Sequence, residues 1–353
     1  MENQKQYDIC LISSALIESV PTPPAGVPSL VAYLKAQGYF PLVLDLDLFF
    51  KKIIPAYRFF LFLECQLIFA RQSRFNVPIS NKNAKKIQKV NDFKSIGRRG
   101  LKKIGKALLG QVRKWKNSSF KIQSFTLERT FEMLNDNTNF SDIEKRLKSL
   151  LEERIKDVKM VGISVTYPDQ ILYSLLTAKI IKQIDKDVFI VLGGSQITTY
   201  INKFINDHGL SKFVDAFIVH DGEEGLCELI DAVQNNKPFN FIPNLYYRDQ
   251  NSFKASEKVD YVMPLEKYMT PDYDGYDLTD YPEDMLSIRT LRGCYWGKCT
   301  FCSYSYTGGK FRVFTDLEFV IDSIKTLQEK NKVRRFEFID DSLPAKFLKK
   351  IAE

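Results

Sequence analysis

The chain has 353 residues, of which 44% are hydrophobic and 27% are charged. This composition is typical of a soluble globular protein, and the length is sufficient for two domains. The most apolar run, residues 59–70, contains Glu64 and is shorter than the roughly 18 residues that a membrane span needs. We therefore predict no transmembrane segment. Because the N-terminus also lacks the pattern of an export signal, we expect a cytoplasmic protein.

Five apolar, β-rich runs alternate with helical patterns over most of the first 235 residues. This alternation predicts a parallel sheet with helices on both faces, and strands without polar alternation predict a sheet that is buried on both sides. We therefore expect an α/β domain with a doubly wound sheet over residues 1–237. The predicted strands are residues 7–13, 40–46, 160–165, 188–193 and 215–220.

The connection between the second and third predicted strands carries an insertion at about residues 50–140. Within it, residues 71–121 contain 16 lysines or arginines and one acidic residue, Asp92, in a chain with a net charge of +8. Long loops without secondary structure are uncommon, so we expect helices near residues 55–70 and 124–134. The basic segment is either a solvated insertion or a surface for an anionic partner, such as nucleic acid, a membrane surface or an acidic peptide.

Residues 238–284 are rich in Pro, Asn, Asp and Tyr and predict a linker that contains a hairpin at residues 245–254. A new pattern then begins with a predicted strand at residues 285–290. It continues through a cysteine-rich loop and a helix around Val320, and reaches a strand at residues 335–339. This β-α-β pattern predicts the start of a second domain, which we place at residues 285–353.

Three of the six cysteines, Cys294, Cys299 and Cys302, lie within nine positions in the sequence RGCYWGKCTFC. Clustered cysteines in a cytoplasmic protein usually bind metal or carry out chemistry. Plant-type two-iron ferredoxins begin with the same spacing but need a fourth cysteine, and none follows Cys302. A structural zinc site also needs a fourth Cys or His, and remains the weaker alternative. Three thiolates without a fourth protein ligand favour a [4Fe-4S] cluster with one iron left open.

The other cysteines, Cys10, Cys65 and Cys227, each lie in an apolar stretch, and we predict that they pack as small hydrophobic side chains. The cysteine-rich loop also contains aromatic residues, which are expected to exclude water from a metal centre, although ordinary packing would explain them as well. These aromatic residues are Tyr295, Trp296, Phe301, Tyr304 and Tyr306.

These motifs resemble those of radical S-adenosylmethionine (SAM) enzymes that carry an N-terminal cobalamin-binding domain. In the C-terminal half the resemblance rests on SIRTLRGCYWGKCTFC at residues 287–302, on the Arg-then-helix stretch after Phe311, and on FEFIDDSL. In the N-terminal half it rests on PPAGVPSLVAYLKAQGY, VLGGSQIT and HDGEEGLCELI. The usual family spacing is Cys-x3-Cys-x2-Cys, so this chain has one extra residue between Cys294 and Cys299.

The resemblance implies a flavodoxin-like first domain of the cobalamin-binding type, followed by the first βα units of a partial TIM-like radical SAM barrel, as in a truncated product. The three cysteines would hold the cluster, the open iron would bind SAM, and the backbone at Phe301 would lie near the adenine. Reductive cleavage would then give a 5′-deoxyadenosyl radical. The implied reaction is methyl transfer to an unactivated carbon of a natural product or ribosomal peptide, with a flavodoxin or ferredoxin as electron donor.

Ligands of open α/β sheets bind beyond the C-terminal ends of the strands, and the resemblance makes cobalamin the expected ligand there. The loop after the first strand contains no histidine, so the Asp-x-His-x-x-Gly signature that supplies a lower cobalt ligand is absent. Either cobalt is bound without a protein imidazole, or the chain is a cobalamin-independent enzyme or a non-catalytic binding protein. The expected cobalamin surface comprises Ser13, Ser164, Thr166, Gly193, Gly194, Ser195, Gly222 and Glu223.

Two carboxylates, Asp340 and Asp341, follow the last predicted strand at the expected mouth of the barrel. The resemblance implies that they contact SAM or the substrate. Asp residues at this place are equally suited to the N-cap of a following helix, and the sequence leaves both roles open.

Overall fold

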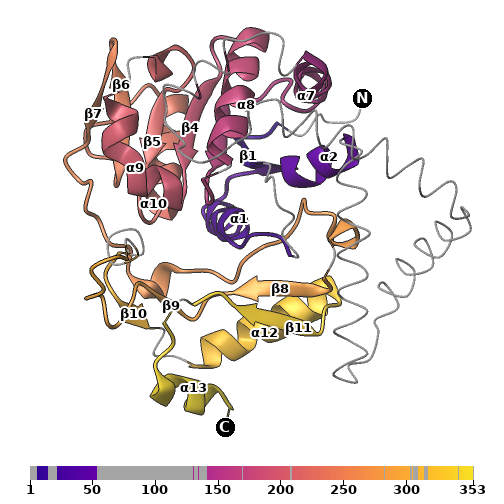
Figure 1. The fold of residues 1–353 in the computed structure, drawn as a ribbon, viewed down its shortest axis with the longest axis vertical. Helices are drawn as coiled ribbons and strands as arrows, with labels where there is room; N and C mark the ends of the chain where they lie inside the picture. Colours follow the sequence, from indigo (N-terminus) through magenta and orange to yellow (C-terminus); the bar gives the residue numbers. More distant parts are fainter. Residues whose placement is uncertain are drawn as a thin grey trace, which may run out of the picture.

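The structure is a computed structural model that describes residues 6–14, 22–53, 130, 134, 141–168, 170–206, 209–281, 283–302, 304, 309–313, 317–340 and 342–352. Its largest element is a seven-stranded sheet with the order β2-β1-β3-β4-β5-β6-β7 (Figure 1). The first five strands follow the flavodoxin-like order 2-1-3-4-5. The strands are β1 (Ile9–Ser13), β2 (Pro41–Asp45), β3 (Met160–Ser164), β4 (Phe189–Gly193), β5 (Ala216–Ile218), β6 (Leu245–Asp249) and β7 (Ser252–Ala255).

The five predicted strands are confirmed, and each end lies within two residues of its predicted place. They pair in parallel, because each of the four connections between them returns the chain to the same edge of the sheet. The hairpin predicted at residues 245–254 is also present. It does not stand apart from the sheet, however: β6 pairs antiparallel with β5, and β7 with β6. The sheet is therefore mixed rather than entirely parallel.

Two hydrophobic cores cover the two faces of the sheet, because successive side chains of a strand point to opposite sides. In β1, Cys10 and Ile12 belong to one core, while Ile9 and Leu11 belong to the other. The first core receives helices α2 (Leu46–Ile53), α7 (Ser141–Arg154), α8 (Gln170–Ile184) and α9 (Ser195–Ile205), and the second receives α1 (Gly26–Ala36) and α10 (Glu223–Gln234). This doubly covered sheet is the arrangement expected from its apolar strands.

The insertion lies almost entirely outside the described residues, which include only its first residues, up to Ile53, together with Thr130 and Leu134. The helix predicted near residues 55–70 and the basic segment 71–121 lie outside the described residues. Of the helix predicted near residues 124–134, only Thr130 and Leu134 are described, and both are helical. Cys65 also lies outside the described residues.

A second, smaller part of the structure follows the hairpin. Strands β8 (Met285–Ile288) and β11 (Arg335–Phe338) pair in parallel and are joined through α12 (Leu317–Asn331), which confirms the predicted β-α-β pattern. Two short strands, β9 (Leu291–Arg292) and β10 (Arg312–Val313), pair antiparallel on either side of the cysteine-rich loop. The remaining elements are α13 (Ala345–Ala352) and the 3-10 turns η1 (Leu210–Lys212), η2 (Leu265–Lys267) and η3 (Leu278–Asp280).

The second part packs against the face of the sheet that carries α1 and α10 (Figure 1). Leu286 and Ile288 of β8 and Leu327 of α12 share one buried core with the residues of α1 and α10. Polar contacts support this packing, since the Tyr281 hydroxyl donates to the carboxylate of Asp45, the last residue of β2, at 2.5 Å. The two parts are therefore joined by a common hydrophobic core.

An ion-pair cluster, which we call the lysine clamp, joins the same two parts at their surface. Lys35 of α1 and Lys330 of α12 each approach Asp272 to 2.8 Å and Asp274 to 2.9 Å. Burial alone would raise the pKa of Asp272, but hydrogen bonds from Lys330 and Lys35 outweigh it and lower the pKa to about 2. The carboxylate is therefore more stable in the folded chain than in the unfolded chain.

The lysine clamp gives a prediction for the pH dependence of stability. Because the folded-state pKa of Asp272 is depressed, its stabilisation is present above the ordinary value of 3.8 and is lost as the pH falls towards about 2. We expect the native chain to lose roughly 1–2 kcal/mol more of its unfolding free energy than Asp272→Asn between pH 5 and pH 2. Urea denaturation across this range measures the difference, and parallel curves for the two chains would contradict it.

Candidate functional site

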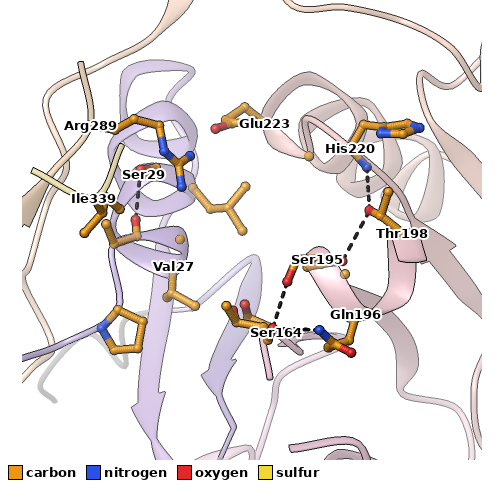
Figure 2. A pocket seen from close by; sticks show the side chains of 18 of the residues that line it. Val27, Ser29, Ser164, Ser195, Gln196, Thr198, His220, Glu223, Arg289 and Ile339 are labelled. Atoms are coloured by element: carbon orange, nitrogen blue, oxygen red, sulfur yellow. Dashed lines mark hydrogen bonds between the residues drawn. The ribbon is translucent and has the colours of Figure 1, made fainter. Parts of the chain in front are cut away.

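A cavity of about 850 Å³ lies at the C-terminal edge of the sheet, between the sheet and the second part of the structure. This edge includes the gap between β1 and β3, where the strand order reverses, which is the usual ligand site of doubly wound folds. Figure 2 shows Ser164, Ser195 and Gln196 at the ends of the parallel strands, with Arg289 and Ile339 contributed by the second part. The cavity therefore has one wall from each part of the chain.

Most of the residues predicted to bind cobalamin come together in this cavity. Two predicted cofactor residues do not line it: Ser13 is buried at the end of β1, and Phe301 is 91% exposed in the cysteine-rich loop. Asp341 lies outside the described residues. The predicted residues that do line the cavity are Ser164, Thr166, Gly193, Gly194, Ser195, Gly222, Glu223 and Asp340.

The turn between β4 and α9 forms part of the cavity wall and depends on Gly194. This residue has φ +105°, and a Cβ there would lie 2.5 Å from the carbonyl oxygen of Val165. The close approach lets the Gln196 amide donate to the Val165 carbonyl at 3.1 Å, and the Ser195 hydroxyl donates to the Thr166 carbonyl at 2.8 Å. The ends of β3 and β4 are thus held together by a turn that only glycine fits without strain.

Gln170 holds the neighbouring end of β1, and the sequence analysis did not single it out. Its Oε1 accepts hydrogen bonds from the amides of Thr166 and Tyr167, at 2.6 and 3.0 Å, while its Nε2 donates to the Ser14 carbonyl at 2.9 Å. One buried side chain therefore ties together the loops that follow β1 and β3. The sequence did offer a signal for this role, because Gln170 is a polar residue at the start of the otherwise apolar helix α8.

Two arginines, Arg289 and Arg292, contribute positive charge to the opposite wall and were also missed. The Nη2 atom of Arg292 lies 3.1 Å from Oε1 of Glu223, whose side chain is almost fully buried. Arg292 and burial together lower the pKa of Arg289. Burial alone would lower the pKa of Arg292, but Glu223, Tyr268 and Asp221 outweigh burial, so that the pKa of Arg292 is raised. Ser287 of β8 and Arg289, the residue directly after β8, are two positions apart, and this spacing was the sequence signal that both face the cavity.

His220 lies on the same wall as Glu223, at the end of β5 (Figure 2). Its backbone has φ +56°, and its amide donates to the Thr198 hydroxyl at 2.9 Å. Burial lowers the pKa of its imidazole below the ordinary value, although Asp221 and Asp260 act in the opposite direction. A neutral imidazole at neutral pH follows, which is the form that binds metals.

Asp340 is engaged with the backbone rather than capping a helix. Its carboxylate accepts hydrogen bonds from the Thr290 amide at 3.0 Å, from the Thr290 hydroxyl at 2.6 Å and from the Leu291 amide at 3.0 Å. Helix α13 begins only at Ala345, so Asp340 is not its N-cap. Through these bonds Asp340 fixes the turn between β8 and β9, which leads directly into the cysteine-rich loop.

The three clustered cysteines lie in the loop between β9 and β10. Cys294 is half-buried, and Cys299 and Cys302 are exposed. The Gly297 amide approaches the Cys294 sulfur at 3.5 Å, and the Cys302 amide donates to the Cys299 carbonyl at 3.3 Å. Over the described residues, no group of three Cys, His, Asp or Glu side chains is arranged to hold a metal ion. The thiols share one loop but do not converge in this structure.

Three of the described aromatic residues of this loop point away from a shielding role, whereas Tyr304 is half-buried and lines the cavity. Tyr295 and Trp296 are more than half exposed, and Phe301 is almost entirely exposed. Tyr306 lies outside the described residues. The loop ends are close together, since Gly293 has φ +75° and a Cβ there would lie 2.7 Å from the Gly309 carbonyl oxygen. The loop is therefore closed at its base and open to solvent at its tip.

The remaining described cysteines behave as packing residues. Cys10 is fully buried, and burial raises the pKa of its thiol to about 12. Burial also raises the pKa of Cys227. Thiols with raised pKa values are poor nucleophiles and poor metal ligands, which agrees with the packing role predicted for both.

The cavity and the cysteine-rich loop suit the two expected cofactors, cobalamin and the iron–sulfur cluster, in different ways. The cavity combines apolar side chains, such as Leu11, Leu30 and Val191, with exposed backbone at Gly193, Gly194 and Gly222. Such a surface suits a large ligand that rests against backbone at strand ends. The cysteine-rich loop offers three thiols, the donor set of iron–sulfur clusters. The donor chemistry of both places therefore fits.

None of the helices that the structure describes is long and apolar enough to cross a lipid bilayer.

No protein-family model matches the chain. Over 213 residues it is 28% identical to "Uncharacterized methyltransferase PH0819" of Pyrococcus horikoshii, an alignment that covers 59% of this chain and 44% of that protein. Among solved structures, it superposes on the radical SAM methyltransferase TsrM of Kitasatospora setae with a TM-score of 0.55 and 16% identity, over 98% of this chain and 50% of TsrM.

It also superposes on the cobalamin-dependent radical SAM enzyme OxsB with a TM-score of 0.56 and 14% identity, over 97% of this chain and 35% of OxsB. The chain thus spans half or less of the length of these proteins. At such identities the superpositions show a shared fold. The chain has the α/β fold of the N-terminal portion of cobalamin-dependent radical SAM enzymes, with a mixed, mostly parallel seven-stranded sheet.

Proposed function

We propose that the chain is the cofactor-binding portion of a cobalamin-dependent radical SAM methyltransferase. The observation that carries this proposal is the cavity at the switch point of the sheet, whose second wall includes Arg289 and Arg292, directly before the three-cysteine loop. A methyl-carrying cofactor in the cavity and a cluster on the loop would then act on one shared space. The related methyltransferase and the folds of TsrM and OxsB support the same assignment.

When bound, the cluster would supply one electron for cleavage of SAM, and cobalamin would carry the methyl group. Cys294, Cys299 and Cys302 would hold the cluster. The backbone at Gly193 and Gly194 and the side chains of Ser164, Thr166 and Ser195 would support the corrin. Asp340 would keep the turn before the loop in place through Thr290 and Leu291.

The proposal extends to the class of substrate. We expect a natural product or ribosomal peptide in which an unactivated carbon accepts the methyl group. A flavodoxin or ferredoxin would deliver the electrons, and an anionic partner would meet the basic segment 71–121. The partial barrel around β8 and β11 would contribute one side of the substrate site.

Titration of the chain with hydroxocobalamin, followed by absorbance, tests the occupant of the cavity. We expect saturable binding with one site per chain, and weaker binding when Ser164→Trp fills the cavity from the end of β3. Ser252→Trp, on the exposed edge strand β7, is the matched control because it adds the same side chain outside the cavity. Binding that Ser164→Trp leaves unchanged would contradict the cavity as the site. Absence of binding to the native chain would instead favour a cobalamin-independent enzyme.

A further inference from the structure

We propose that Asp221 and Glu223 are positioning residues that hold both ends of the cysteine-rich loop and couple it to the ligand in the cavity. Asp221 lies in the connection between β5 and α10, and Glu223 is the first residue of α10. We call residues 221–223 (Asp221, Gly222 and Glu223) the acidic turn. The proposal rests on the proposed function for the identity of the two cofactors, but its structural basis is independent of that function.

Asp221 holds the strand that leaves the loop. Its carboxylate is almost fully buried, with Oδ2 3.0 Å from Nη2 of Arg312 in β10 and Oδ1 2.8 Å from the hydroxyl of Tyr268. The Met263 amide donates to Oδ2 at 3.3 Å, and Arg312 donates through Nη1 to the Met263 carbonyl. The carboxylate and the guanidinium are therefore both fixed by additional hydrogen bonds.

Glu223 holds the strand that enters the loop. Its Oε1 lies 3.1 Å from Nη2 of Arg292 in β9, and Nε of Arg292 lies 3.8 Å from Oδ1 of Asp221. Arg292 stands opposite Arg312 in the β9–β10 pair. Both guanidinium groups also lie over the ring of Tyr268, at 5.0 and 6.0 Å from its centroid. Cation–π contacts of this kind add to the charge pairing.

The cluster balances two buried carboxylates against two half-buried arginines. Burial alone would raise the pKa of Asp221, but Arg292 and Arg312 outweigh it, so that the pKa is lowered and the carboxylate stays ionised. Removal of one member leaves an uncompensated charge in a largely buried site and forces the others to move. The loop ends would move first, since β9 and β10 are only two residues long each.

The acidic turn also faces the cavity. Gly222 and Glu223 line it together with Arg292, while Asp221 does not line it and instead contacts Arg312 and Tyr268. A ligand in the cavity can therefore contact Glu223, which pairs with Arg292. Arg292 lies only two positions before Cys294 in the sequence. This arrangement gives a short physical path between the two proposed cofactors, built from one turn and two ion pairs.

The lysine clamp provides the matched control for this proposal. It also joins the two parts of the structure through ion pairs, but these lie at the surface and their members are Lys35, Asp272, Asp274 and Lys330. None of these described ion pairs involves a residue of the loop or of the acidic turn. Loss of docking between the two parts can thus be separated from loss of loop positioning.

Hydrogen exchange of the cofactor-free 353-residue chain, read by mass spectrometry, gives the first test. We expect Asp221→Asn to speed exchange over residues 291–302 by roughly tenfold or more, because the ends of the loop open locally. Asp272→Asn should leave these peptides unchanged within about twofold while it weakens the contact between the two parts. Equal exchange in the two variants, or slow exchange in Asp221→Asn, would overturn the positioning role.

The second test measures coupling. In the native chain, hydroxocobalamin should slow exchange over residues 291–302 and alter the electron paramagnetic resonance spectrum of the reduced cluster, whereas in Asp221→Asn it should bind without either change. Responses in the variant equal to those of the native chain would refute the coupling. If the native chain takes up neither cofactor, the proposed function fails, while the first test still decides whether Asp221 positions the loop.

Discussion

The Cys302→Ala chain is expected to lose the iron–sulfur cluster completely. After anaerobic reconstitution it should retain less than about a tenth of the iron and acid-labile sulfide of the native chain, because only two thiolates would remain on the loop. The same loss is expected for Cys294→Ala and Cys299→Ala, since the three thiols share one loop and no fourth cysteine follows them. Iron and sulfide counting together with the absorbance of the reconstituted chain measures the effect.

Cys227→Ala is the control for this prediction. Cys227 is half-buried in α10 with a raised thiol pKa, so its removal should leave the iron and sulfide content unchanged. If Cys302→Ala kept a full complement of iron and sulfide, the loop would not be the cluster site. If the native chain instead bound about one zinc ion and no sulfide, the alternative of a structural zinc site would replace the cluster.

Gly194→Ala carries the second large expected effect, on stability. The backbone there has φ +105°, a conformation that costs about 1–3 kcal/mol for a residue with a side chain. The added Cβ would also lie 2.5 Å from the Val165 carbonyl oxygen, so the end of β3 or of β4 has to move. We expect the unfolding free energy to fall by at least about 2 kcal/mol, measured by urea denaturation. Hydroxocobalamin binding should weaken as well, because the displaced turn lines the cavity.

Gly193→Ala separates this effect from simple crowding at the strand end. A Cβ at Gly193 would meet the Ile218 carbonyl oxygen at 3.5 Å, an ordinary contact, and its backbone does not have a positive φ. Its stability should stay within about 1 kcal/mol of that of the native chain. Equal destabilisation by the two substitutions would show that Gly194 has no special conformational role.

Much of the fold was predictable because the strands of a doubly covered sheet are continuous apolar runs. The segments around Ile12, Ile163 and Leu192 stood out for this reason, and the ends of those runs located the cavity edge at Ser164 and Gly193. The pairing of β6 with β5 was less visible. The strand β6 continues into exposed Arg248 and Asp249, as an edge hairpin or a linker also would.

The contacts that organise the site could not be predicted, because they join residues far apart in the chain. Arg312 meets Asp221, and Asp340 meets Thr290, across separations that no local pattern records. The sequence motif around Asp221 indicated a ligand-binding turn, yet its carboxylate faces the arginines that flank the cysteine-rich loop. The sequence left the role of Asp340 open for the same reason. In the structure its carboxylate accepts hydrogen bonds from two backbone amides and a hydroxyl.

The most direct test of the central claim is the electron paramagnetic resonance spectrum of the reconstituted, dithionite-reduced native chain, recorded with and without SAM. A cluster held by Cys294, Cys299 and Cys302 leaves one iron without a protein ligand, so SAM should bind there and shift the spectrum. The account predicts a [4Fe-4S] signal that changes on addition of SAM and is absent from Cys302→Ala. A chain with no iron–sulfur signal, or with a signal that SAM leaves unchanged, would contradict it.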